Sequence, residues 1–449
     1  MESLLYGFRY HGLNFFRSII PEPQDRQPWT LNHVPYFAFS YIPFFLLAYL
    51  ARRPDTHTLR LLLFPIVAIL ILAAAFRYYW SIPSLNVYNW GQCLFAEVTL
   101  AKAIEYAFTP EGMLKVGETR AGEQTEQTEQ NQKPSNGHAY TNGTANGHAK
   151  SPSTFPEQHG SHSYFPQWFS DATELMFALR GPQYKFGKGL HMPKMTRPLQ
   201  RSPFLKSTLL SFIKNLLLLD LFETVIKLFP GVGDVEGGSM FYPNLPPLQR
   251  FAVGTFVHML TGSALLAGFG MVYDLFTLIA VGLFNDSSTN WPPVTDHPWS
   301  SGSLHELWAK HWHQLLRQTF IVYGGYPGKW IGGAFGAVLG TFIASGLYHE
   351  CAIYAMGRGF DYAPPLFFTM QAFLLVLERV WRQATGRRVG GWYGRLWVYF
   401  VMFILSQPMV DSWHRRGLGG GMIIPPFISP AKLLLPHFIM CINSLLRSL

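Results

Sequence analysis

Long uncharged hydrophobic runs recur along the chain, and several reach the length of a membrane span. Residues 34–50 carry no charge and are soon followed by Arg52 and Arg53. At about 1.5 Å per residue this run extends roughly 26 Å as a helix, close to the thickness of a bilayer core. Residues 61–76 form a second run that ends in Arg77 and an aromatic cluster typical of a membrane interface. Both runs predict transmembrane helices.

Seven further hydrophobic runs follow, and two of them are interrupted by charges. The longest is expected to cross the membrane once and to include a re-entrant or interfacial piece, because a second crossing would move the last basic loop to the other side. Together the runs predict an all-α integral membrane protein with about 8–9 transmembrane helices. The further runs are residues 87–108, 204–229, 251–284, 330–356, 366–381, 396–410 and 422–446.

A polar segment, residues 109–165, separates the first membrane helices from the rest. Its centre reads EQTEQTEQNQKPSNGHAYTNGTANGHAKSPS. Such residues cannot bury enough apolar area to offset the entropy of ordering, so we expect a disordered loop. The chain then divides into an N-terminal amphipathic segment at residues 1–33, the first membrane helices at 34–108, the loop at 109–165, and the remaining membrane domain at 166–449.

The composition fits a membrane protein once the polar loop is set aside. Only 14% of the 449 residues are charged and 49% are hydrophobic, whereas a soluble protein carries about a quarter charged residues. The mean hydropathy of +0.11 is low because the loop dilutes it. The loop holds six glutamates against four basic residues, so the net charge of +9 comes from the rest of the chain. This composition excludes a nucleic-acid-binding array.

Three of the predicted loops are rich in basic residues. With nine spans, all three fall on one side of the membrane, and this side is expected to be cytosolic because basic loops stay inside. The large polar loop is then cytosolic too. The basic residues are Arg52, Arg53 and Arg60, then Lys185, Lys188, Lys194, Arg197 and Arg201, then Arg382, Arg387, Arg388 and Arg395.

One histidine lies inside a predicted span, residues 330–356, where an ionisable side chain is costly and is a functional candidate by default. This residue, His349, has no evident packing role, although His349 and Glu350 could form a buried polar pair that fixes the helix. A zinc-binding HExxH motif is excluded because Ile353 stands at its second histidine position. Glycines recur every fourth residue ahead of the histidine and predict close helix packing: Gly332, Gly336 and Gly340.

A second group of histidines follows a predicted helix start. Ser303 and Glu306 have the spacing of a capping box, so we expect one amphipathic helix that reads LHELWAKHWHQLLRQTFIVY. His311 and His313 are two residues apart and point to different sides of such a helix. His305 lies about 12 Å from His313 along the axis. One metal cannot take these histidines, and we expect no metal site.

Two histidines from different elements suit proton transfer. A neutral imidazole can take a proton from a hydroxyl, and burial disfavours its charged form. A second polar side chain could orient an acyl donor or stabilise developing charge. The sequence contains no GxSxG nucleophile elbow. Direct transfer in a ternary complex is therefore favoured over a covalent acyl-enzyme.

Three stretches together resemble the wax-synthase-like branch of the membrane-bound O-acyltransferase family. They are Trp291-Pro292-Pro293, then SLHELWAKHWHQLLR, then the run that ends SGLYHE. The family pattern is a Pro-Pro loop, an S-L-x-x-F-W-x-x-x-W-H-Q helix and, one span later, S-G-x-x-H-E. Leu307 stands where Phe is usual. Arg180-Gly181 resembles the Arg-Gly segment after the variable loop, and the core similarity covers residues 291–358.

The resemblance implies a helical fold around an intramembrane reaction tunnel that acyl-CoA enters from the cytosolic side, without a metal. His349 maps to the histidine that acts as general base, and His313 to the W-H-Q histidine that assists the donor or the transition state. The branch includes fungal-type enzymes that use acetyl-CoA. We favour an O-acetyltransferase of a lipophilic terpenoid or meroterpenoid alcohol, in a multi-pass protein of the endoplasmic reticulum whose catalytic membrane domain is residues 166–449.

Two other functions stay open at this point. One is a long-chain acyl-CoA:alcohol acyltransferase that makes wax or sterol esters, because no feature of the sequence indicates the length of an acyl tunnel. A transporter of a hydrophobic solute is the other, although no self-similar halves are visible. The expected partners are acyl-CoA, a small lipophilic alcohol and the bilayer, with no nucleic acid. The sequence predicts neither the oligomeric state nor the residues that contact CoA.

Overall fold

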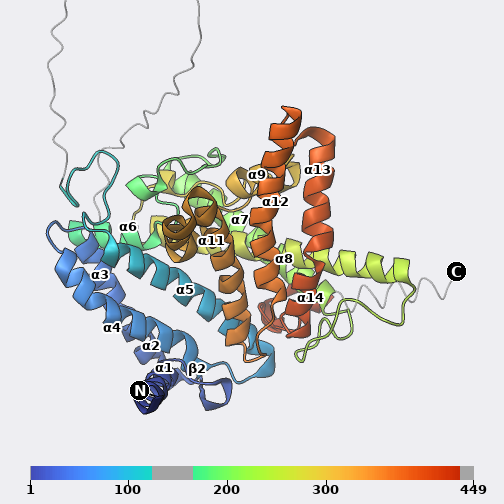
Figure 1. Ribbon diagram of the computed structural model, residues 1–449, viewed down its shortest axis with the longest axis horizontal. Coiled ribbons are helices and arrows are strands. Elements are labelled where there is room, and N and C mark those ends of the chain that lie inside the picture. Colours follow the sequence, from blue (N-terminus) through green and yellow to red (C-terminus); the bar gives the residue numbers. More distant parts are fainter. Residues whose placement is uncertain (1, 124–164, 435–449) are drawn as a thin grey trace, which may run out of the picture.

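The computed structural model describes residues 2–123 and 165–434, and these residues are mostly helical (Figure 1). The exceptions to helix and loop are two short parallel strands, β1 (Gln27–Pro28) and β2 (Tyr78–Tyr79). Most of the polar loop lies outside the described residues, as do residues 435–446 of the last predicted span at 422–446. The all-α class predicted from the hydrophobic pattern is confirmed for the described part of the chain.

The helices are listed here in chain order. The α-helices are α1 (Glu2–Ile19), α2 (Val34–Ser40), α3 (Ile42–Ala51), α4 (His57–Phe76), α5 (Val87–Phe108), α6 (Gln167–Phe177), α7 (Arg201–Ile226), α8 (Pro247–Gly282), α9 (Leu304–Glu306), α10 (Arg317–Phe320), α11 (Tyr326–Ala355), α12 (Ala363–Thr385), α13 (Gly391–Phe400) and α14 (Gln407–Arg415). The π-helical segments are η7 (Leu307–His311), η8 (Ile321–Gly325) and η9 (Val401–Leu405). The 3-10 segments are η1 (Pro23–Asp25), η2 (Leu31–His33), η3 (Pro83–Leu85), η4 (Lys185–Gly187), η5 (Ser288–Asn290), η6 (Pro298–Ser300) and η10 (Pro426–Ile428).

Five segments of the described chain are long and apolar enough to cross a membrane. Two other long helices, α5 and α7, fall outside this group because charged residues interrupt them, as the sequence already indicated. The count of 8–9 spans is thus not established by length and apolarity. The five segments are Leu31–Ala51, His57–Phe76, Pro247–Gly282, Arg317–Ala355 and Ala363–Thr385.

The long helix α8 runs without interruption over 36 residues, or about 54 Å, which fits the expected single crossing. Of the two additions expected, a re-entrant or an interfacial piece, the re-entrant break is absent from residues 247–282. Helix α8 packs antiparallel on α7, with Gly270 against Asn215 and Gly282 against Leu205. An ion pair between Arg197 and Asp274, at 2.7 Å, ties the segment before α7 to the same helix. Helix α7 has 26 residues against 36 in α8, so it packs along part of α8.

Helix α11 belongs to a tight helical hairpin rather than to one straight span. Gly332 and Gly333 leave the helical conformation, with φ of −132° and 58°, and the chain reverses there. A Cβ added at Gly336 would collide with the backbone of Gly328, and one added at Gly340 would collide with that of Gly324. The predicted close packing of the glycine stripe is confirmed for Gly336 and Gly340, but Gly332 forms the turn. The chain therefore reverses direction at residues 332–333, within the apolar segment 317–355.

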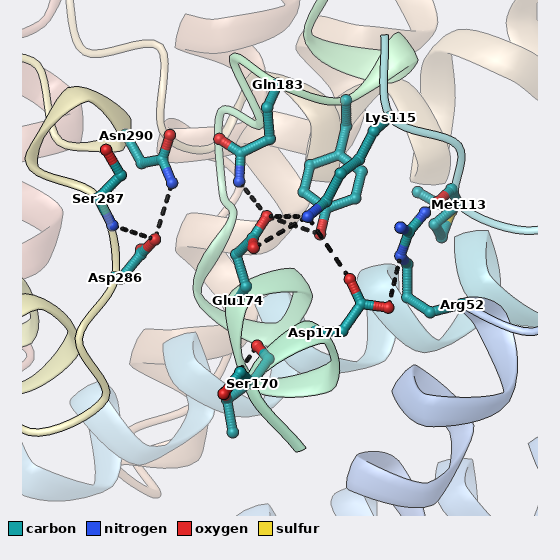
Figure 2. Close-up of polar contacts among 12 residues, drawn as sticks. Arg52, Met113, Lys115, Ser170, Asp171, Glu174, Gln183, Asp286, Ser287 and Asn290 are labelled. Carbon is teal, nitrogen blue, oxygen red and sulfur yellow. Dashed lines mark hydrogen bonds and ion pairs between the residues drawn. The ribbon is translucent and has the colours of Figure 1, made fainter. Parts of the chain in front are cut away.

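The first residues of the predicted polar loop are held by charged side chains. Arg52, at the end of α3, contacts Glu118 at 2.7 Å and Asp171 of α6 at 3.1 Å. Lys115 lies 3.0 Å from Glu174 of α6 (Figure 2). Burial acts to raise the pKa of Glu118, but hydrogen bonds from Arg52 and from the Lys115 backbone outweigh burial and lower it. The expected disorder of the polar loop therefore does not hold for residues 109–123, which these ion pairs keep in place. Composition could not reveal this, because the partners of these residues lie far away in the sequence.

The glycine hairpin makes a sharp prediction. Gly336→Ala places a methyl group against the Gly328 backbone, so we expect a lower unfolding temperature in detergent and a lower yield of folded protein. Gly91→Ala in α5 is the matched control because nothing lies within 4 Å of its added Cβ, and helix propensity there favours Ala by about 1 kcal/mol. A Gly336→Ala protein that unfolds at the wild-type temperature would show that the hairpin is not close-packed.

Candidate active site

A cavity of about 540 Å³ lies between α8, the α11 hairpin, α12 and the segment from α13 to α14. Its wall consists mainly of apolar and aromatic side chains, with a few polar groups among them. Each of the three π-helical segments η7, η8 and η9 contributes residues to the wall. Such segments are rare and occur often at functional sites. The cavity is therefore the candidate active site.

The helix expected from residue 303 starts as predicted but breaks early. The Ser303 hydroxyl accepts a hydrogen bond from the Glu306 backbone N–H at 3.1 Å, which confirms the cap. After α9 and η7, Trp312 adopts an extended ψ of 158° and the single helix that the sequence predicts ends. The Gln314 side chain donates to the backbone oxygens of Trp308 and Trp312, at 3.0 Å each. Carbonyls freed by the break are thereby satisfied.

The break directs His313 into the cavity wall. His313 is 8% exposed, and its ring lies 4.9 Å from that of Phe269 in α8. Its Nδ1 is buried and has no partner among the described residues. His313 lies outside the five candidate spans. Burial, followed by the nearby charges of His349 and Arg180, lowers the pKa of His313, so the neutral imidazole is favoured.

The tautomer of His349 follows from one hydrogen bond. Its Nδ1 lies 2.7 Å from the backbone oxygen of Ser345, one turn earlier in α11. A carbonyl oxygen can only accept, so Nδ1 carries the proton and Nε2 of the neutral ring keeps a lone pair. Nε2 has no hydrogen-bond partner in the described part of the chain, and His349 lines the cavity. This arrangement fits a proton acceptor.

Aromatic side chains hold the ring of His349 in place. The Phe368 ring of α12 stacks on it, with centroids 4.5 Å apart and planes 19° apart. The Trp413 ring of α14 lies 6.2 Å away and nearly parallel. His349 and His313 thus come from different elements and line one cavity, as an acyl-transfer site would require. The sequence analysis did not single out Phe368 or Trp413, because ordinary apolar runs contain both.

Glu350 does not pair with its neighbour His349. It is fully buried and binds Arg416 through both carboxylate oxygens, at 2.5 and 2.8 Å. It also accepts a hydrogen bond from the Asp361 backbone, and Asp361 binds Ser412 of α14 at 2.7 Å. The suggested His349–Glu350 pair is therefore wrong. Arg416, which no sequence motif singles out, is buried in this ion pair.

Arg180 fixes the Pro-Pro loop beside the cavity. It is 4% exposed and donates hydrogen bonds to the backbone oxygens of Pro292 and Pro293 and to the Tyr273 hydroxyl. Before the loop, the Trp291 indole donates to Asp286 at 2.9 Å. Figure 2 shows Asp286 also accepting from Ser287 and Asn290. These hydrogen bonds fix the position of residues 286–293, which precede His313 in the chain.

The other histidines of the motif do not gather around a metal. The His311 side chain contacts the backbone oxygen of Asp296, away from His313, while His305 lines the cavity separately. Among the described residues, no three His, Cys, Asp or Glu side chains are placed to hold a metal ion.

The buried ion pair predicts a stability effect. Glu350→Ala leaves the Arg416 charge buried without a partner, so we expect a loss of about 3–5 kcal/mol in the free energy of unfolding. The double variant Glu350→Gln, Arg416→Met should recover much of this loss in a denaturation assay in detergent. Glu22→Ala breaks an exposed pair with Arg17 and should change stability by about 1 kcal/mol or less. Equal stability of Glu350→Ala and wild type would contradict the assignment.

Comparisons with known proteins agree with the motifs. Residues 291–371, which contain His313 and His349, match the model of the Membrane bound O-acyl transferase family. The chain is 30% identical over 161 residues to acetyltransferase aurG of Calcarisporium arbuscula, a match over 33% of this chain and 38% of that relative. The chain thus covers little more than a third of the length of the curated relative it matches. No solved structure matches the chain. The resemblance predicted from the motifs is confirmed: residues 291–371 of this chain are similar to the Membrane bound O-acyl transferase family.

Proposed function

We propose that this chain is an O-acyltransferase that moves an acetyl group from acetyl-CoA to a hydroxyl of a lipophilic terpenoid or meroterpenoid alcohol. The observation that carries the proposal is the hydrogen bond from Nδ1 of His349 to Ser345, which leaves a lone pair on Nε2 in an apolar cavity. The family match supports acyl transfer, and the similarity to a protein named as an acetyltransferase supports acetyl as the group transferred.

The proposed reaction is a direct displacement in a ternary complex. Nε2 of His349 takes the proton of the alcohol as the alcohol oxygen attacks the thioester carbon. The new C–O bond forms, the C–S bond breaks, and the proton passes from His349 to the departing CoA thiolate. No residue carries the acyl group between steps. An apolar cavity favours this route because it excludes water that would otherwise hydrolyse the thioester.

His313 is proposed to act on the acyl donor. Its imidazole lines the same cavity as His349. A hydrogen bond from this ring would orient the thioester or stabilise negative charge on its oxygen or sulfur. The hydrogen bonds that Gln314 makes to the freed carbonyls support this role because they hold the segment rigid.

We also propose the membrane arrangement. Residues 166–449 form the catalytic domain, within about 8–9 membrane helices that surround the cavity as a tunnel. The protein lies in the endoplasmic reticulum, with the loop at residues 109–165 and the CoA entrance on the cytosolic side. Five segments with the length and apolarity of membrane spans support a multi-pass protein.

His349→Ala should abolish the reaction while the protein still accumulates. Loss of a general base lowers the rate about 10²–10⁴-fold. Membranes containing the protein are mixed with acetyl-CoA or palmitoyl-CoA and a panel of terpenoid, sterol and linear alcohols, and CoA-thiol release and ester formation are measured. Wild type should release CoA with acetyl-CoA. The control His297→Asn changes an exposed histidine whose φ of 51° suits Asn, and it should retain activity.

Each other result of that assay has a definite meaning. Near-normal turnover by His349→Ala would falsify its role as base. A preference for palmitoyl-CoA would replace the acetyl proposal by a long-chain acyltransferase. Uptake of a hydrophobic solute without release of CoA would replace the enzyme by a transporter.

His313→Asn should retain more activity than His313→Ala. The Asn amide can still offer a hydrogen bond to the donor, whereas Ala cannot, so the Ala variant should lose about 10²–10³-fold in rate. The rate of CoA release by both variants is compared with wild type at equal protein level. Wild-type rates in both variants would remove His313 from the site.

A further inference from the structure

A third histidine lines the cavity away from His313 and His349. His258 lies on α8 and is 8% exposed. Its ring packs 5.5 Å from that of Phe403 in η9. The surrounding wall is apolar, with Met402 and Met409 among its members. Neither the sequence motifs nor the reaction proposed above uses this side chain.

The imidazole of His258 is almost without hydrogen bonds. Its Nδ1 is buried and has no partner among the described residues. Its Nε2 lies 3.5 Å from the Ser406 hydroxyl, the outer limit for a hydrogen bond. The proton of that hydroxyl is directed to the Met402 backbone oxygen, so Ser406 can offer His258 only a distant acceptor.

The nearest polar neighbour on α8 cannot satisfy His258 either. The Thr261 hydroxyl bonds to the Val257 backbone oxygen and contacts His414, each at 2.8 Å. Buried polar groups in proteins are nearly always hydrogen-bonded, and an exception calls for an explanation. A ligand that fills the cavity and carries a polar atom at this depth would supply the missing partner.

Distances along two helices indicate how far His258 lies from His349 and His313. Ser406, which His258 contacts, precedes α14, and Trp413 near His349 lies about 10 Å further along that helix. Along α8, His258 lies about 16 Å from Phe269, which packs on His313. His258 is therefore separated by about two helical turns of α14 from the residue that stacks on His349, and by about three turns of α8 from the residue that packs on His313.

We propose that His258 binds a second oxygen function, a hydroxyl or a carbonyl, on the alcohol that the enzyme acetylates. This inference rests on the proposed function. A neutral imidazole carries one donor and one acceptor, so it can bond either group. The second oxygen lies away from the reacting hydroxyl, on a skeleton that lies along the apolar wall. The hydrocarbon end of a long acyl chain offers no such partner, so the acceptor occupies this end.

The test compares matched acceptors. From the alcohol panel we take the skeleton that the wild-type membranes acetylate fastest, as a mono-alcohol and as the same skeleton with a second hydroxyl or ketone at its far end. Wild type should prefer the doubly oxygenated acceptor by about tenfold in kcat/KM, the value of one hydrogen bond. His258→Phe keeps the shape of the ring and should bring the ratio close to one, mainly through a higher KM for the doubly oxygenated acceptor.

Two further variants complete the design. His258→Gln can still form a hydrogen bond and should restore part of the preference. Met402→Leu changes an apolar residue of the same wall and should leave the ratio as in wild type. An unchanged ratio in His258→Phe, an equal loss for both acceptors, or no preference in wild type would each overturn the inference.

Failure of the inference can be told apart from failure of the proposed function. Absence of CoA release from wild type with every alcohol contradicts the function itself. Acetyl transfer without selectivity between the matched acceptors contradicts only the role of His258. Should His258→Phe fail to accumulate, the wild-type ratio and the His258→Gln variant still decide the matter.

Discussion

Nδ1 of His349 donates its proton to the Ser345 backbone oxygen, and the chemistry of the cavity depends on this one bond. It fixes the tautomer without a carboxylate, so no negative charge has to be buried beside the ring. Phe368 then holds the plane of the imidazole. The adjacent Glu350 faces a different environment, where Arg416 neutralises it. Two consecutive residues of α11 thus have different environments: His349 lines the cavity, and Glu350 is buried in an ion pair that joins α11 to the end of α14.

Irregular helix is concentrated where the cavity is. The three π-helical segments, the break at Trp312 and the glycine hairpin all lie on or next to its wall. In an apolar interior, backbone groups freed from a helix need partners, and non-helical backbone is tolerated where protein surrounds it or where it lines a cavity. Gln314 supplies such partners to Trp308 and Trp312. The irregular segments open space for a substrate that regular packed helices would fill.

Hydrophobic runs, a capping box and a histidine inside a span were sufficient to predict the helical class, the start of α9 and one cavity residue, His349. The break at Trp312 was not predictable from periodicity, because residues 303–323 keep a helical pattern through it and only distant packing ends the helix. The glycine stripe predicted close packing but not its partner, since Gly328 lies on the other arm of the hairpin. Arg416 pairs with a residue 66 positions away, and no local signal marks that contact.

Nitrogen NMR of the histidine side chains tests the central claim most directly. The wild-type protein and His349→Ala, both labelled with ¹⁵N-histidine and held in detergent micelles, give by difference the signals of His349. We predict a proton on Nδ1 and a lone pair on Nε2 at neutral pH. A proton on Nε2, with the lone pair on Nδ1, would contradict the hydrogen bond to Ser345 and with it the assignment of His349 as the base.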